Sequence, residues 1–221
     1  MNAERTRRLD GLVLPRFAAR QSGPPFVVAI EGPNGAGKST LCRALCRALA
    51  APGCLGTDAA WFAEPFRTRM IRDADWFASA MFFLSGCIEQ MRVLRGAAAP
   101  LVIMDRSLWS TLAVHAARSP ARLQALLTML EPVAAQVRIP SLTLVLEASF
   151  ATCQSRIGRK GRAARALDEL TASPGFHARE RAFYAWLSRQ VPALAFLNVD
   201  GVSRREVLER ARVLIRERVR C

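Results

Sequence analysis

Short runs of apolar residues recur along the chain and end at glycine or polar residues. The clearest runs cover 26–30, 101–104, 142–146 and 194–199, and a weaker one lies between Cys54 and Phe62. Uninterrupted apolar runs of this length are typical of strands that are buried on both faces of a sheet. The pattern therefore predicts four strands and a weaker fifth.

Longer stretches with apolar residues at helical spacing lie between these runs. They cover about 38–50, 76–95, 107–136, 149–157, 175–190 and 204–219, and the last begins with a capping box of Ser203 and Glu206. Strands that alternate with helices imply crossover connections and a parallel, doubly wound sheet. We expect an α/β fold with one domain at 23–221 after a basic N-terminal extension at 1–22.

The composition is that of a globular protein. Hydrophobic residues make up 51% of the 221 residues and charged residues 23%, and no apolar run reaches the roughly 20 residues of a membrane helix. The six cysteines form no C-x-x-C pair, and two histidines are too few to suggest a metal cluster. With no apolar signal segment near the start, we expect a soluble, cytoplasmic protein with reduced thiols.

Positive charge is concentrated in three segments, 1–22, 156–165 and 200–221. The chain has a net charge of +14, and Lys38 and Lys160 are its only lysines among 32 basic residues. Such a charge suits nucleic-acid binding or the handling of phosphorylated small molecules, and its clustering favours a local anion site with solvated ends. The extension is either a basic amphipathic segment for a membrane or partner, or a docked or frayed tail.

The segment Gly32–Ser39 matches the phosphate-loop pattern G-x-x-x-x-G-K-[ST], directly after the first strand and before a helix. The alternative, a glycine-rich turn that binds nothing, fits this context poorly. In such loops backbone N–H groups surround phosphate oxygens, the lysine reaches the β- and γ-phosphates, and the serine contacts Mg²⁺. The predicted ligands are ATP and Mg²⁺, bound by Gly32, Asn34, Gly35, Ala36, Gly37, Lys38, Ser39 and Thr40.

Asp105 and Arg106 follow the next strong strand, at the edge where parallel sheets bind ligands. Asp105 is a candidate Mg²⁺ ligand or proton acceptor, and Arg106 a candidate clamp for the transferred phosphoryl group. The alternative is a helix cap with a surface arginine, although Ser107 offers a cap of its own.

Glu64 precedes Pro65 at the end of the weak strand, and proline stops a strand at this point. Its carboxylate would accept a proton from a substrate hydroxyl or bind a sugar; the alternative is an ordinary surface glutamate. The segment 156–165 carries five cations and no acid. We interpret it as a lid in which Arg159 and Arg162 stabilise the transferred charge, with a solvated charge run or an RNA contact as alternatives.

Together these motifs resemble the thymidylate kinase family of phosphate-loop nucleoside monophosphate kinases, from about residue 26 onward. The phosphate loop, the segment 104–113 and the residues Phe176, Arg179, Arg181 and Tyr184 occur in the family's order. The resemblance implies a five-stranded parallel sheet, an ATP·Mg²⁺ donor, a deoxynucleoside monophosphate acceptor and a homodimer.

The chain departs from the family where the acceptor binds. Asn34 replaces an acidic residue, Ala63 replaces an arginine, and Cys87 replaces the arginine that contacts the base. Thymine recognition therefore lacks its usual guanidinium donor. The candidate acceptor-binding residues are Glu64, Arg67, Phe83, Cys87, Arg106 and Trp109, with Phe83 and Trp109 as aromatic rings for the base.

The sequence thus predicts ATP-dependent phosphoryl transfer to a nucleoside monophosphate or a related nucleotide. Glu64 with Asp105 and Arg106 also resembles deoxynucleoside kinases, so phosphorylation of a nucleoside 5′-hydroxyl is the nearest alternative. A phosphate-loop ATPase that binds nucleic acid or a protein partner is an alternative of another class, as is a kinase fold retained as a binding module. The position of the charge does not favour nucleic acid, and no membrane span is expected.

Overall fold

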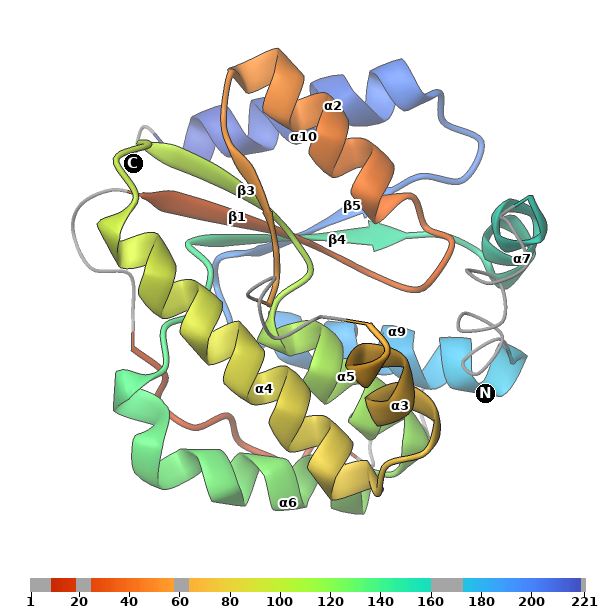
Figure 1. The fold of residues 1–221 in the computed structure, drawn as a ribbon. Coiled ribbons are helices and arrows are strands. Elements are labelled where there is room, and N and C mark those ends of the chain that lie inside the picture. Colours follow the sequence, from red (N-terminus) through yellow and green to blue (C-terminus); the bar gives the residue numbers. More distant parts are fainter. Residues whose placement is uncertain (1–8, 19–24, 58–63, 160–172, 220–221) are drawn as a thin grey trace.

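The computed structural model describes residues 9–18, 25–57, 64–159 and 173–219. A single five-stranded parallel sheet, in the order β2-β3-β1-β4-β5, forms its centre, as Figure 1 shows. The strands are β1 (Phe26–Glu31), β2 (Gly53–Leu55), β3 (Leu101–Asp105), β4 (Leu142–Glu147) and β5 (Leu194–Asn198). This is the predicted α/β fold.

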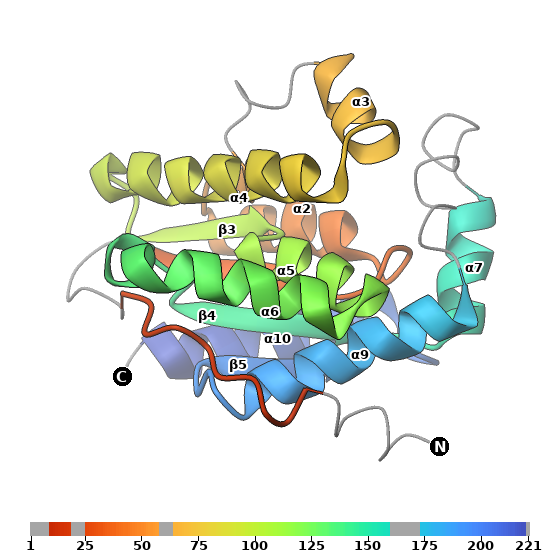
Figure 2. The ribbon, with the colours of Figure 1, turned by 90° about the horizontal axis from the view of Figure 1, so that it is seen from below.

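Helices cover both faces of the sheet (Figures 1 and 2). Helices α2 (Lys38–Leu49) and α10 (Arg204–Val219) cover one face, and α4 (Trp76–Val93), α5 (Leu108–Arg118), α6 (Pro120–Leu130) and α9 (Pro174–Ser188) lie on the other. Helix α7 (Phe150–Gly158) follows β4, and the short α3 (Phe66–Arg72) precedes α4. Two 3₁₀ helices, η2 (Leu94–Gly96) and η3 (Glu131–Gln136), complete these elements.

Alternate residues of β1 pack against the helices on opposite faces of the sheet. Val28 and Ile30 pack in the cluster that contains α2 and α10, whereas Val27 and Ala29 pack with Met91 of α4. This alternation follows from the two-residue period of a strand. It determines which side of the sheet each functional residue at a strand end faces.

The structure corrects three details of the sequence prediction. The helix expected over 107–136 breaks at Ser119, whose hydroxyl caps α6, with Pro120 as the first residue of that helix. Helix α3 was not predicted, and within the described residues the weak strand covers Gly53–Leu55, while 58–63 lie outside them. Glu64 therefore does not end a strand but lies just before α3.

The described part of the N-terminal extension is docked on the domain, across α6 and α9 in Figure 2. Leu9 is buried, the indole N–H of Trp186 donates to the carbonyl of Leu12 at 3.3 Å, and the N–H of Leu14 donates to Gln190 at 2.7 Å. Residues 9–18 thus behave as a docked tail. Among the described residues no helix is both long and apolar enough to cross a membrane.

Candidate active site

The phosphate loop joins β1 to α2 through three glycines with left-handed backbones. Gly32, Gly35 and Gly37 have φ values of 123°, 87° and 106°. A Cβ atom at Gly32 would lie 2.5 Å from the carbonyl oxygen of Leu146, and one at Gly35 would lie 2.5 Å from that of Cys153. The loop can lie this close to β4 and α7 only because these residues lack side chains.

Lys38 is the buried first residue of α2. Its ammonium donates to the carbonyl oxygens of Gly32 at 2.6 Å and Pro33 at 2.7 Å. Burial and, next, the charge of Arg106 lower the pKa of Lys38 to about 8, against the opposing effect of Glu180, Asp105 and Glu31. The loop therefore holds a cation that carries its proton at pH 7 with a smaller margin than an exposed lysine.

Ser39 and Asp105 offer oxygen atoms that suit a magnesium ion whose other ligands are mainly phosphates. Ser39 is exposed at the start of α2, and the Oδ1 atom of Asp105 is buried and accepts no hydrogen bond within the described part of the chain. No cluster of three or more His, Cys, Asp or Glu side chains able to hold a metal occurs among the described residues. Mg²⁺ typically takes one or two carboxylates together with substrate phosphates and water.

Arg106 lies at the junction of β3 and the phosphate loop. Its guanidinium donates to the Oδ1 atom of Asn34 and, at 3.2 Å, to the Oγ atom of Ser110. Its backbone is left-handed, with φ of 73°, which costs a non-glycine residue about 1–2 kcal/mol. The surrounding contacts hold this conformation, and a guanidinium is thereby fixed against the donor-binding loop.

Two buried carboxylates near Lys38 and Arg106 were not among the site residues predicted from the sequence. Glu31, the last residue of β1, and Glu180 of α9 are both buried. Burial raises the pKa of Glu180, while Lys38 and then Arg106 oppose that shift. Glu180 lies four residues after Phe176 and four before Tyr184, both buried, so its helical spacing could have revealed an acid on the buried face.

Arg156 of α7 is a third residue near the phosphate loop that was not predicted as a site residue. Its guanidinium donates to the carbonyl of Ala36 in the phosphate loop at 2.8 Å and to that of Val199 after β5 at 3.3 Å. The arginine thus ties α7 to the loop. Arg159 is exposed after the end of α7, whereas Arg162 and residues 160–172 lie outside the described residues, so the lid stays a prediction.

Glu64 is exposed and hydrogen-bonded to α3, the helix that follows it. Its Oε2 atom accepts hydrogen bonds from the backbone N–H of Thr68 at 3.2 Å and from the Thr68 hydroxyl at 2.7 Å. Arg67 lies 3.5 Å from the other carboxylate oxygen. The bond from Thr68 is the main cause that lowers the pKa of Glu64. Helix α3 buries none of its residues.

The three residues expected around the acceptor base differ in exposure. Phe83 is partly exposed on α4 and meets Phe82 edge-on, with ring centroids 5.2 Å apart. Cys87 and Trp109 belong to one buried core cluster, and Trp109 has no exposed surface. Trp109 thus presents no exposed face for a base to stack on in this structure, and the Cys87 side chain is nearly buried.

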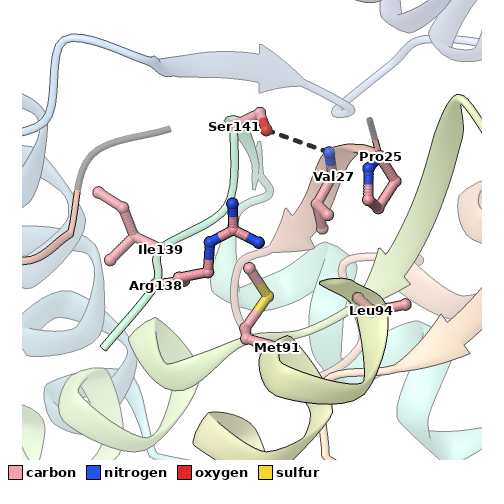
Figure 3. Close-up of a pocket in the computed structure, with 7 residues that line it drawn as sticks. All are labelled: Pro25, Val27, Met91, Leu94, Arg138, Ile139 and Ser141. Carbon is pink, nitrogen blue, oxygen red and sulfur yellow. Dashed lines mark hydrogen bonds between the residues drawn. The ribbon is translucent and has the colours of Figure 1, made fainter. Parts of the chain in front are cut away.

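A small pocket lies at the opposite end of the sheet from the phosphate loop (Figure 3). Its volume is about 20 Å³, close to the space that one water molecule needs. It is too small for a nucleotide. Its lining residues are Pro25, Val27, Met91, Leu94, Arg138, Ile139 and Ser141.

The sequence model of the thymidylate kinase family matches residues 30–179, from the end of β1 into α9. The chain belongs to the thymidylate kinase family. No curated protein sequence matches the chain significantly. Membership in this family makes the protein a nucleotide kinase, a phosphotransferase that uses a nucleotide-phosphate donor, and confirms the predicted activity class.

Solved structures with the same fold include two kinases. A deoxyadenosine kinase from M. mycoides with the products dCMP and dCDP bound is 18% identical, with a TM-score of 0.65 over 86% of this chain and 99% of its own. Thymidylate kinase from Candida albicans is 19% identical, with a TM-score of 0.64 over 89% of this chain and 93% of its own. At this identity the similarity establishes the fold of this thymidylate kinase family member, and leaves its acceptor undetermined.

Proposed function

We propose that this protein transfers the γ-phosphoryl group of ATP·Mg²⁺ to a nucleoside monophosphate or a closely related nucleotide. The observation that carries the proposal is the hydrogen bond from the Arg106 guanidinium to Asn34. This bond fixes a guanidinium beside the loop that would hold the donor. Positioning and charge stabilisation supply most of the catalysis of phosphoryl transfer.

The residues around the phosphate loop have surroundings that suit the roles proposed for them here. Loop N–H groups and Lys38 bind the β- and γ-phosphates, and Arg106 neutralises charge on the transferred group. An acceptor phosphate oxygen forms the new bond to phosphorus as the bond to the bridging oxygen breaks, and ADP leaves with that electron pair. Ser39 and Asp105 would hold Mg²⁺, which neutralises phosphate charge when bound. Arg159 and Arg162 would add positive charge from the lid.

The setting of Glu64 favours a phosphate acceptor over a hydroxyl acceptor. A nucleoside 5′-hydroxyl needs a base to take its proton, whereas an ionised phosphate oxygen needs none. The Glu64 carboxylate is occupied by Thr68, and its pKa is lowered chiefly by that contact, which makes it a weaker base. Arg67 is the candidate for contacting the acceptor phosphate, and Phe83 for stacking on the base.

Thymine need not be the acceptor base. Cys87, which stands where the family has an arginine, is buried and offers a base no guanidinium. The acceptor class therefore includes other pyrimidine nucleotides and modified ones. The homodimer stays a prediction from the family resemblance, and the cytoplasmic location stays a prediction from the sequence.

The test is ADP release from ATP·Mg²⁺ over matched panels of nucleosides and nucleoside monophosphates, modified pyrimidines included. We expect monophosphates to react, and Lys38→Ala to lower kcat by about 10³-fold because it removes the loop cation. Arg43→Ala, on the exposed side of the same helix, is the matched control and should retain activity.

Two results would contradict the proposal. Reaction with nucleosides alone would establish the nucleoside kinase alternative. ADP release that no acceptor stimulates, but that DNA or RNA does, would favour the ATPase alternative, and nucleic-acid affinity across a salt series would then follow.

A further inference from the structure

Glu31 is a carboxylate at a position where the strand pattern calls for an apolar residue. It continues the alternation of Val27 and Ala29 on the face of β1 that α4, α5 and α9 cover, and it has no exposed surface. Removing a carboxylate from water costs several kcal/mol unless hydrogen bonds replace the lost hydration. A residue this costly at this place invites a functional explanation.

Three hydroxyl groups surround the Glu31 carboxylate. Ser107 donates to Oε1 at 2.7 Å, while Ser110 at 2.5 Å and Tyr184 at 3.0 Å donate to Oε2. The serines belong to the start of α5 and the tyrosine to α9. Burial raises the pKa of Glu31, and the hydrogen bonds from Ser110 and Ser107 oppose that shift, because carboxylate oxygens accept such bonds best when ionised. The cage thus replaces part of the lost solvent.

Ser110 links this cage to Arg106. Its Oγ atom donates to Glu31 and accepts from Nη1 of Arg106 at 3.2 Å. A hydroxyl has one proton to donate, so donation to Glu31 turns its lone pairs toward the guanidinium. Since the other terminal nitrogen of Arg106 donates to Asn34, the guanidinium is held at two points.

We propose that Glu31 is a positioning residue for phosphoryl transfer and acts through Ser110 to fix the Arg106 guanidinium against the phosphate loop. This assignment rests on the proposed function, since it needs Arg106 to stabilise the transferred phosphoryl group. Glu31 itself does not touch substrate. Tyr184 supports the carboxylate from α9, so a helix remote in sequence contributes to the position of Arg106.

Two serine variants separate positioning from support of the fold. Ser110→Ala and Ser107→Ala each remove one hydroxyl from Glu31, but of the two only Ser110 accepts a hydrogen bond from the Arg106 guanidinium. We expect Ser110→Ala to lower kcat by about tenfold with little change in KM for ATP, because misplacing a catalytic group costs rate. Ser107 caps α5, so Ser107→Ala should lower Tm and keep kcat within about twofold.

A double-mutant cycle with Arg106→Ala tests the route of the effect. If Ser110 and Glu31 act through Arg106, then Ser110→Ala and Glu31→Gln should each lower kcat in the wild type and add almost nothing in the Arg106→Ala background. Full additivity, or a Ser110→Ala enzyme with the wild-type kcat, would overturn the proposal. Equal losses in the Ser107 and Ser110 variants would also overturn it.

A measurement without substrate keeps this test separate from that of the proposed function. NMR signals of ¹⁵N-labelled arginine should show restricted rotation of the Arg106 guanidinium in the wild type and in Ser107→Ala. Faster rotation is expected in Ser110→Ala and Glu31→Gln. Restricted rotation without kinase activity on any acceptor would refute the proposed function alone, and unchanged rotation in Ser110→Ala would refute the link to Arg106.

Discussion

On the donor side the chain from Glu31 to Pro33 is buried, as is Lys38, whereas α3, on the proposed acceptor side, buries none of its seven residues. The phosphate loop contacts β4 and α7 through backbone atoms and is tied to Arg106 and Arg156. Glu64, by contrast, lies just before α3 and contacts Thr68 and Arg67 of that helix.

This difference suggests how the two ligands are recognised. A loop fixed by backbone contacts can bind the triphosphate common to all donors without rearrangement, because its N–H groups are already oriented. A helix that rests on the surface can shift at little cost in buried area. We expect the donor side to be rigid and the acceptor side to adapt, and the following predictions test that contrast.

Among the changes that test this contrast, the largest expected effect comes from adding one methyl group to the loop. Gly35→Ala would force a left-handed residue to carry a Cβ atom 2.5 Å from the carbonyl of Cys153, so the loop must move away from α7. We expect kcat/KM for ATP to fall about 100-fold, since displacing a binding group by about 1 Å costs this much. Gly96→Ala, which meets nothing within 4 Å, is the control, and wild-type kinetics for Gly35→Ala would disprove a rigid loop.

A smaller effect is expected on the acceptor side. Glu64→Gln keeps a carbonyl oxygen for Thr68 and removes the charge, so α3 should hold its position. We expect kcat to change about fivefold or less, because the proposed acceptor needs no base. A loss of 100-fold or more in steady-state assays, with unchanged circular dichroism, would instead make Glu64 the base of a nucleoside kinase.

The smallest expected effect is the uptake of a proton by the protein when ATP binds. Because the pKa of Lys38 is lowered to about 8, much of the lysine is neutral at pH 8.5, and bound phosphates restore its charge. Calorimetry in buffers of different ionisation enthalpy should show proton uptake at pH 8.5 and almost none at pH 6.5. ATP affinity should accordingly weaken as the pH rises above 8.

Lys38→Arg is the control for this measurement, since an arginine stays protonated throughout that range. Equal proton uptake by wild type and variant would assign the proton to another group. Buried Glu31 and Glu180 are the nearest candidates, because both interact electrostatically with Lys38.

The sequence predicted the donor side well because the phosphate loop is contiguous and the strands around it are apolar throughout. The four strong strands lie where the apolar runs indicated, to within one residue at each end. Helix α3 escaped prediction because a short helix without buried residues leaves no periodic pattern. The break at Ser119 and Pro120 was visible as a cap followed by proline, and was outweighed by the apolar residues on both sides.

The acceptor side was harder to predict because periodicity identifies a helix and not its surroundings. Trp109 and Cys87 both occupy positions consistent with a ligand pocket, yet each faces the core between helices. Glu31 was overlooked for the opposite reason, since a polar residue at the end of an apolar run resembles a strand boundary. Its role depends on Ser107, Ser110 and Tyr184, which only the folded chain brings to it.

The alternation of side chains between the two faces of β1 limits which insertions and deletions this strand can accept. Ile30 faces the α2 and α10 layer, and its neighbour Glu31 faces α5 and α9. Deleting or inserting one codon inside this strand would exchange the two and place a carboxylate among aliphatic side chains. Natural variation in this strand should therefore occur as substitutions between similar residues, and insertions and deletions should accumulate in the connecting loops.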